Sequence, residues 1–181
     1  TELGIGKGDT VAVLAFNTPE MFEAHFFVPM TGAVLNTINT RLDAETLAYI
    51  LDFGEGKELV VDRELLPLTQ SALQKTKSNP VLILIGDGTA LQKPDVELEV
   101  KHYEELIISG DPEFSCPPLA DEWQALSLNY TSGTTGKPKG VVYHHRGAYL
   151  MSMGTAVGWE LSNHPRYLYS VPMFNCNGWC H

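Results

Sequence analysis

Short apolar runs alternate with longer amphipathic stretches along the first half of the chain. The apolar runs predict buried β-strands over residues 10–16, 34–38, 58–61 and 81–85. Helices are predicted from Thr18, from Asp43 and over residues 63–76. Strands that alternate with helices are typical of βαβ units. We therefore expect an α/β fold with a doubly wound, mostly parallel sheet and flanking helices.

The first two predicted helices carry clear boundary signals. Thr18 offers a capping hydroxyl, and Pro19 suits the first helical position. Asp43 offers a capping carboxylate to the second helix, and Phe53-Gly54 marks its end. These signals predict where each helix begins more firmly than the apolar pattern alone.

Apolar residues at helical spacing predict the faces that these helices bury. The first helix is expected to place four residues in the core: Phe22, Phe26, Phe27 and Met30. The second is expected to bury Leu47, Ile50 and Leu51. His25 lies in the first helix, and we expect it to be a structural histidine rather than a ligand for a metal or a substrate.

A loop-rich stretch over residues 86–122 opens the second half of the chain, and a short helix is predicted within it at residues 103–108. Apolar and polar residues then alternate over Ala125–Tyr130, and Gly140–Tyr143 is rich in β-prone residues. Because a short loop separates them, we expect two antiparallel strands joined in a hairpin.

The last part of the chain predicts one helix and one strand. The helix runs from Arg146 to about Glu160. Its expected core face consists of Tyr149, Leu150, Met153 and Val157. A strand is expected over Arg166–Val171, where Pro172 would end it.

Composition narrows the class of protein. The length of 181 residues suits one domain or part of one. No apolar run approaches the length of a membrane span, and Val81–Ile85 is the densest. Three cysteines, Cys116, Cys176 and Cys180, suggest no disulfide framework and favour a reducing compartment.

The net charge of −10 is unevenly distributed. Residues 1–123 carry 8 Lys/Arg and 21 Asp/Glu, whereas residues 124–181 carry 4 Lys/Arg and 1 Asp/Glu. The second part is therefore net positive, which suits an anionic ligand. It lacks the dense basic stripe of a nucleic-acid-binding protein, so we expect no nucleic-acid partner.

Residues 130–141 read Tyr-Thr-Ser-Gly-Thr-Thr-Gly-Lys-Pro-Lys-Gly-Val. The run combines hydroxyl donors, glycines that let backbone N–H groups approach an anion, and two lysines, which together predict polyphosphate binding. It is not a Walker loop, because Pro138 follows Gly136-Lys137 and Thr131 stands where the first glycine belongs. Nor is it a nucleophile elbow, which would need glycine in place of Tyr130.

This run resembles the phosphate-binding signature of the AMP-forming acyl-activating superfamily, also called adenylate-forming enzymes. Residues 32–42 resemble the family's early Gly-Ala-Val…Asn-x-Arg segment, and Pro172–Trp179 resembles its Pro-x-Phe-His-x-x-Gly segment. The three segments occur in the family's order. The resemblance implies that residues 1–181 form part of the large N-terminal AMP-binding domain. The later motifs and the small C-terminal domain with its catalytic lysine are expected outside this chain, which alone would be inactive.

The resemblance implies a reaction in two steps. A carboxylate attacks the α-phosphorus of ATP and releases pyrophosphate, and a thiol, usually coenzyme A, then displaces AMP. ATP, Mg²⁺ and coenzyme A are thus the expected cofactors and co-substrates. The expected phosphate-binding residues are Thr131, Ser132, Gly133, Thr134, Thr135, Gly136, Lys137 and Lys139. Thr131 is also expected to contact Mg²⁺, and Lys139 is favoured over Lys137.

The same resemblance places an acyl-substrate pocket at Phe174, Asn175 and Trp179. Similar sequences usually carry histidine where this chain has Asn175, and asparagine can hydrogen-bond but cannot become cationic. We expect Asn175 to orient the substrate carboxylate. Phe174 and Trp179 could equally be core aromatics. The basic run His144-His145-Arg146 has two open interpretations: a cluster near the phosphates, or the polar start of a helix.

The sequence resembles most the acyl-CoA synthetases of short- and medium-chain fatty acids and similar small acids. Alternatives within the family are a peptide-synthetase adenylation domain and a coumarate-type ligase. Alternatives to this activity are a kinase-like phosphate-binding domain and a non-catalytic or divergent homologue. The expected location is the cytoplasm, or the peroxisomal matrix in a eukaryote.

Overall fold

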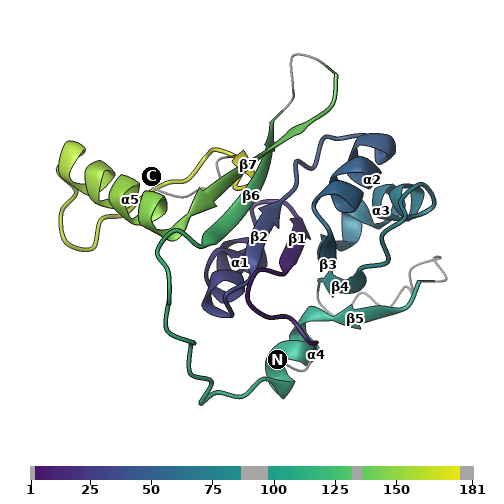
Figure 1. Cartoon of the computed structure of the whole chain (residues 1–181), viewed down its shortest axis with the longest axis horizontal. Coiled ribbons are helices and arrows are strands. Elements are labelled where there is room, and N and C mark those ends of the chain that lie inside the picture. The colour runs from purple at the N-terminus through teal and green to yellow at the C-terminus, as the bar shows by residue number, and fades with distance from the viewer. Residues whose placement is uncertain (1–2, 87–97, 132–135, 176–181) are drawn as a thin grey trace.

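The chain folds around one seven-stranded sheet with strand order β5-β4-β3-β1-β2-β6-β7 (Figure 1). The computed structural model describes residues 3–86, 98–131 and 136–175. The strands are β1 (Thr10–Leu14), β2 (Val34–Thr37), β3 (Gly56–Asp62), β4 (Val81–Ile85), β5 (Val100–His102), β6 (Ala125–Thr131) and β7 (Lys139–His144). The α-helices are α1 (Pro19–Met30), α2 (Ala44–Phe53), α3 (Leu66–Leu73), α4 (Tyr103–Ser109) and α5 (His145–Gly158), and a 3₁₀ turn, η1, covers Arg63–Leu65.

Strand β1 lies at the point where the winding of the sheet reverses. It pairs in parallel with β2 on one side and with β3 on the other. From β3 the parallel pairing continues through β4 to β5, and β6 adds in parallel to β2. Among the strands of the described residues, β7 alone runs antiparallel, against β6. The prediction of a doubly wound, mostly parallel sheet is therefore confirmed. Ligands of such sheets bind at the carboxyl ends of the strands near the reversal.

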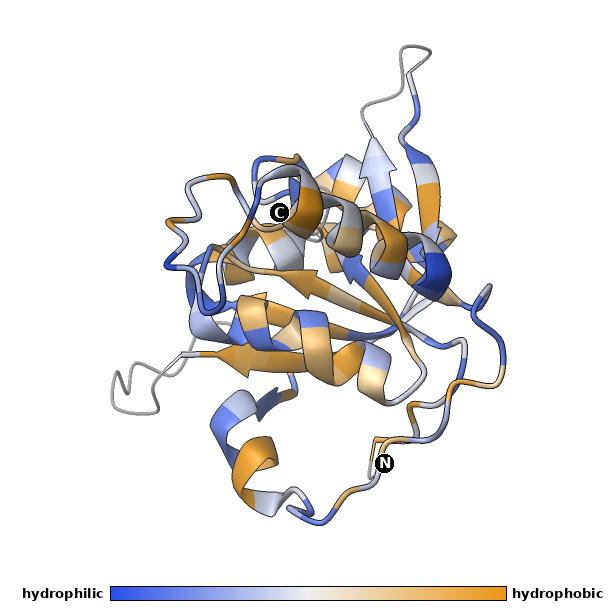
Figure 2. Cartoon of the chain, turned by 90° about the vertical axis from the view of Figure 1, so that its left-hand side faces the viewer, coloured by the Kyte–Doolittle hydropathy of each residue, from blue (hydrophilic) through white to orange (hydrophobic). Residues whose placement is uncertain are grey.

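Helices cover both faces of the sheet, and the alternation of side chains along β1 shows how. Ala12 and Leu14 belong to the buried cluster that includes residues of α2 and α3. Val11 and Val13 belong to the opposite cluster, which includes residues of α1 and α4. Since successive side chains of a strand point to opposite faces, a fully apolar strand can supply both cores. Figure 2 shows this hydrophobic character along the central strands.

The predicted capping residues occupy the predicted positions. The backbone N–H of Met21 donates to Thr18 Oγ1 at 3.3 Å, and Pro19 is the first residue of α1. The backbone N–H of Thr46 donates to Asp43 Oδ1 at 2.8 Å, which lowers the pKa of that carboxyl. Gly54 caps α2 as predicted.

The predicted core face of α1 is wrong. Phe22, Phe26 and Met30 are exposed, and Phe27 is only half-buried. The buried residues of α1 are Met21, Ala24, His25 and Val28. Both sides of this helix are apolar, so spacing alone could not choose between them. The structural role of His25 is confirmed, because its Nδ1 lies 2.7 Å from the carbonyl oxygen of Met21 inside the same helix.

Two further predictions fail near the end of the chain. Helix α5 forms as predicted, but none of its residues is buried, so Tyr149, Leu150, Met153 and Val157 form no core face here. No strand forms over residues 166–171. A strand needs a hydrogen-bonded neighbour and a helix face needs a covering layer, and the described residues supply neither. Hydrophobic segments along α5 face the viewer in Figure 2.

One short strand escaped prediction. Strand β5 contains Lys101 and His102 and spans three residues, too few to show an alternation of polar and apolar positions. It pairs with the end of β4 and leads directly into α4. Over the described residues, no helix is long and apolar enough to cross a membrane.

Candidate functional site

The Gly-rich run joins two antiparallel strands, as predicted. Tyr130 lies opposite Gly140, and Thr131 lies opposite Lys139, at the far end of the β6–β7 pair. In Figure 1 this pair extends beyond the other strands of the sheet. Thr131, Gly136, Lys137 and Lys139 are exposed there. Of the predicted phosphate-binding residues, Ser132, Gly133, Thr134 and Thr135 lie outside the described residues.

Two glycines of the run meet different requirements. Gly136 has a φ of +108°, which residues with a Cβ rarely adopt. Gly140 sits against its neighbours in β6: a Cβ added there would lie 2.9 Å from Leu128 Cδ1 and 3.6 Å from Tyr130 Cε1. Glycine at 140 therefore permits close packing of the Leu128 and Tyr130 side chains against β7.

The residues that flank the Gly-rich run lie against α2. The ammonium group of Lys137 lies 5.3 Å from the centre of the Tyr49 ring, a distance typical of a cation–π contact. Tyr130, just before Thr131, packs partly buried against the same core as α2. Burial, and secondarily the neighbouring Tyr49, raises the pKa of Tyr130 to about 12, so its phenol stays neutral at physiological pH.

The segment around Phe174 lies at the carboxyl ends of β1 and β2. Asn17, which follows β1, donates from Nδ2 to the carbonyl oxygen of Val171 at 2.9 Å. It also accepts at Oδ1 from the backbone N–H of Met173 at 2.8 Å. Thr37, the last residue of β2, donates from Oγ1 to the carbonyl oxygen of Phe174 at 3.3 Å.

Asn129 of β6 joins the two parts of this site. Thr37 Oγ1 also lies 3.5 Å from Asn129 Oδ1, in the strand that continues into the Gly-rich run. Thr37 and Asn129 are both buried. The predicted acyl-pocket segment and the predicted phosphate-binding segment are thus brought to one edge of the sheet, with β2 between them.

The predicted pocket residues differ in their burial. Phe174 is half-buried and packs against the core shared with α1, so both of its predicted roles remain compatible with the structure. Asn175 is exposed, and its backbone N–H donates to the carbonyl oxygen of Pro172 at 2.9 Å. Trp179 lies outside the described residues.

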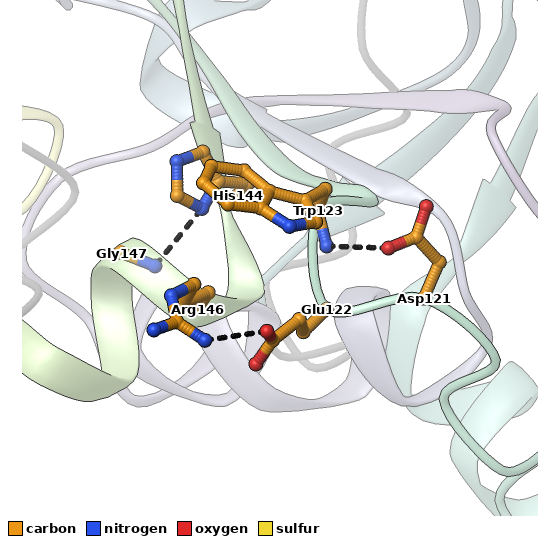
Figure 3. A network of polar contacts seen from close by, with 6 residues as sticks. All are labelled: Asp121, Glu122, Trp123, His144, Arg146 and Gly147. Carbon is orange, nitrogen blue, oxygen red and sulfur yellow. Dashed lines mark hydrogen bonds and ion pairs between the residues drawn. The ribbon is translucent and has the colours of Figure 1, made fainter.

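The basic run His144-His145-Arg146 marks the start of α5 (Figure 3). The backbone N–H of Gly147 donates a hydrogen bond of 2.9 Å to His144 Nδ1, so His144 caps the helix. Arg146 forms an ion pair with Glu122 and places its guanidinium 5.8 Å from the centre of the Trp123 ring. The helix-start interpretation of this run accounts for these contacts.

The position of His144-His145-Arg146 along the hairpin also supports the interpretation of this run as a helix start. His144 pairs with Ala125, whereas the Gly-rich run begins and ends at Thr131 and Lys139. His144 and Lys139 are five residue steps apart along the extended strand β7, or about 17 Å. Burial lowers the pKa of His145, which favours its neutral form. We therefore leave these three residues out of the phosphate-binding site.

The described residues could supply only some of the ligands of a bound metal ion. They contain no group of three or more His, Cys, Asp or Glu side chains that could hold a metal ion. Thr131 presents an exposed side chain whose hydroxyl oxygen suits a hard cation such as Mg²⁺ as one ligand among several. The other ligands would come from phosphate oxygens, water and groups outside the described residues.

Asn17, Thr37, Asn129 and Tyr49 escaped the sequence-based prediction of the site. Asn17 follows a predicted strand directly, and this position at a carboxyl end was the one available signal. Thr37 and Asn129 occur within strand-like runs, and Tyr49 within a helical pattern. Nothing in the local sequence separates them from structural residues.

Comparison with known proteins places this arrangement in a family. Residues 1–181 match the family described as AMP-binding enzyme. An acetate–CoA ligase of Humulus lupulus is 48% identical over 188 residues, covering 98% of this chain and 33% of the ligase. A peroxisomal butyrate–CoA ligase of Arabidopsis thaliana is also 48% identical over 189 residues, covering 99% of this chain and 32% of the ligase.

The fold agrees with these matches. The crystal structure of a long-chain-fatty-acid–CoA ligase from Archaeoglobus fulgidus has a TM-score of 0.82 and 26% identity, and the match covers 96% of this chain and 32% of that one. The chain thus spans about a third of the length of the curated relatives it matches. Its family match extends over the whole sequence, and its fold is that of these ligases: the chain belongs to the AMP-binding enzyme family.

Proposed function

We propose that the protein containing this chain is an AMP-forming acid–thiol ligase that activates a small carboxylic acid with ATP and transfers the acyl group to coenzyme A. The chain would be part of its large N-terminal domain. The observation that carries this proposal is that the described residues flanking the Gly-rich run, Thr131, Gly136, Lys137 and Lys139, are exposed at the end of the β6–β7 pair, beside the carboxyl end of β2. Its support comes from the family match and from the ligase relatives.

The hairpin would act by electrostatic stabilisation. Pyrophosphate leaves with a high negative charge, which preorganised donors and cations can stabilise. We assign the run from Thr131 to Lys139, with Ser132, Gly133, Thr134, Thr135, Gly136 and Lys137, to the β- and γ-phosphates of ATP. Thr131 would also contribute one oxygen to Mg²⁺, which neutralises phosphate charge when bound. The attacking carboxylate is already ionised at neutral pH and needs no base.

The acid would bind beside the Pro172–Asn175 segment. Asn17 and Thr37 hold this segment against the carboxyl ends of β1 and β2, and we propose that Phe174, Asn175 and Trp179 shape the acyl pocket. Asn175 would orient the substrate carboxylate with its amide N–H. Asn175→His should change the KM or the rate for the acid. Identical kinetics with several acids would contradict this role.

The nature of the acid is the finer part of the proposal. Two relatives are named for acetate and butyrate, which favours a short-chain acid over a long-chain one. The name of the Arabidopsis relative also places it in the peroxisome. We propose the cytoplasm or the peroxisomal matrix for this protein. A kinase-like activity is disfavoured, because the phosphate-binding run joins two antiparallel strands rather than a strand and a helix.

Carboxylate-dependent exchange between ATP and labelled pyrophosphate tests the proposal. The full-length protein is assayed with acetate, butyrate, octanoate and benzoate, and with Thr131→Ala. Exchange that requires an acid and falls at least tenfold in Thr131→Ala is the expected result. Ser152→Ala removes an exposed hydroxyl from α5 and should behave as wild type. Production of ADP instead of AMP, or no turnover with any acid, would contradict the proposed activity.

A further inference from the structure

Lys137 and Tyr49 form a contact between the Gly-rich hairpin and α2. The lysine ammonium lies 5.3 Å from the centre of the tyrosine ring. Within the described residues, Lys137 takes part in neither the Lys57–Asp9 nor the Arg146–Glu122 ion pair, and its charge meets the aromatic face of Tyr49. A ring face attracts a cation without neutralising it, and the full positive charge remains available to an anion.

The ring of Tyr49 is itself held in place. It stacks on Phe53 one turn along α2, with ring centres 5.7 Å apart and planes at 18°. Its body packs against the core formed on this face of the sheet. Helix α2 is anchored in that core by Leu47, Ile50 and Leu51, which are almost completely inaccessible to solvent. The position of Tyr49 is therefore fixed by the fold.

Tyr130, which precedes the Gly-rich run, lies against the same helix. A Cβ added at Gly54, which caps α2, would lie 3.3 Å from Tyr130 Oη and 2.9 Å from the carbonyl oxygen of Ile50. Tyr130 is the residue before Thr131, and Lys137 lies on the other side of the run. Both flanks of the Gly-rich run thus lie against α2.

We propose that Tyr49 is a positioning residue for nucleotide binding: its ring holds the Lys137 ammonium at the base of the Gly-rich run, where the charge meets the ATP polyphosphate. A free lysine side chain loses conformational entropy when it is ordered against a phosphate. Tyr49 reduces this loss by ordering the side chain beforehand. The inference rests on the proposed function, since it takes the polyphosphate of ATP as the ligand of the hairpin.

The dissociation constant of Mg·ATP, measured by titration calorimetry on the full-length protein, tests the role of Tyr49. Tyr49→Leu removes the ring and should raise this constant about two- to fivefold, the range of an exposed cation–π contact. Tyr49→Phe keeps the ring and should match wild type. Phe22→Leu removes an exposed ring from α1 and serves as the matched control, with no expected change.

A double-mutant cycle separates positioning from a general loss of structure. In a Lys137→Met background, Tyr49→Leu should have no further effect on the Mg·ATP dissociation constant. An equal effect in both backgrounds would overturn the inference, as would a loss in Tyr49→Phe equal to that in Tyr49→Leu. If wild type binds Mg·ATP and Tyr49→Leu binds it equally well, only this inference fails. If wild type does not bind Mg·ATP, the proposed function fails with it.

A second measurement tests the contact without nucleotide. Lysines of the full-length protein are reductively methylated with ¹³C, and the Lys137 signal is assigned by its loss in Lys137→Arg. The ring current of Tyr49 should shift this signal upfield in wild type and in Tyr49→Phe. The shift should disappear in Tyr49→Leu. A Lys137 signal at the same position in all three proteins would show that no such contact exists and would overturn the inference.

Discussion

Asn17 holds Met173, 156 positions later in the chain, through a hydrogen bond of 2.8 Å from the Met173 backbone N–H to Asn17 Oδ1. The same side chain donates to the carbonyl oxygen of Val171 at 2.9 Å. One asparagine at the carboxyl end of β1 therefore fixes the segment that leads into the proposed acyl pocket. Because the Asn17 side chain makes both hydrogen bonds, substitution of Asn17 measures their effect on substrate binding.

Asn17→Ala should raise the KM for the acid about five- to tenfold, because both hydrogen bonds are lost and each contributes about 0.5–1.5 kcal/mol. The Mg·ATP dissociation constant should stay within twofold of wild type. Asn17→Asp keeps the acceptor for the Met173 N–H and loses the donor to the Val171 carbonyl. Its KM for the acid should therefore lie between those of wild type and Asn17→Ala. Steady-state kinetics with varied acid measures this order. An Asn17→Ala enzyme with an unchanged KM would contradict the assigned position of the pocket.

Gly140→Ala should destabilise the hairpin by about 1 kcal/mol, because the new methyl group would lie 2.9 Å from Leu128 Cδ1. Leu128→Ala should restore part of this loss in the double variant, since it removes the obstructing atom. Gly154→Ala provides the control: nothing lies within 4 Å of a Cβ there, and alanine favours a helix over glycine. Chemical denaturation of the three variants measures the differences. Equal stabilities for Gly140→Ala and Gly154→Ala would contradict this account of Gly140.

Glu58 should make the folded state less stable as pH rises. Burial raises the pKa of this carboxyl from 4.5 to about 7, and the positive charge of Lys101 opposes the effect only in part. Glu58 Oε1 has no hydrogen-bond partner among the described residues. It lies in a cavity of about 580 Å³ lined mainly by apolar side chains, together with Tyr103 and Asp111.

Since the folded chain binds this proton more tightly than the unfolded chain, the contribution of Glu58 to stability is fully present below about pH 4.5 and is lost between about pH 4.5 and 7. The shift corresponds to up to about 3 kcal/mol above pH 7. Glu58→Gln should abolish this part of the pH dependence and raise the unfolding temperature at pH 8 relative to wild type. Thermal unfolding at pH 5 and pH 8 checks it. Parallel pH profiles for the two proteins would count against a neutral buried Glu58.

Lys139, the first residue of β7, and Arg146, in the first turn of α5, carry the same charge and should behave differently. Lys139→Gln should weaken Mg·ATP binding about tenfold, because it removes a cation next to Thr131. Arg146→Gln should leave that binding unchanged, because Arg146 is engaged with Glu122 and Trp123 at the start of α5. Titration calorimetry compares them directly. A comparable loss in both variants would return the basic run to the phosphate-binding site.

Strands β1 to β4 and the starts of α1 and α2 were predictable because their signals are local. Apolar runs found β1 to β4, and Thr18 and Asp43 cap the helices that they were expected to cap. The hairpin around the Gly-rich run was predictable for the same reason. Its chemistry lies in consecutive residues between two β-prone stretches.

Features that depend on tertiary packing were not predictable. The buried face of α1 is set by the sheet beneath it, and Phe22 and Phe26 instead pack against each other at the surface, with ring centres 5.1 Å apart. The Asn17–Met173 and Tyr49–Lys137 contacts join segments far apart in sequence. Residue type alone does not distinguish such an asparagine or tyrosine from any other.

The proposed activity depends on binding of the ATP polyphosphate by the hairpin between β6 and β7. The most direct measurement is a crystal structure of the full-length protein with a non-hydrolysable ATP analogue and Mg²⁺. We predict phosphate oxygens within hydrogen-bonding distance, about 3 Å, of groups in the Thr131–Lys139 run. A fully occupied analogue whose phosphates lie against another part of the protein, with no contact to this run, would contradict it.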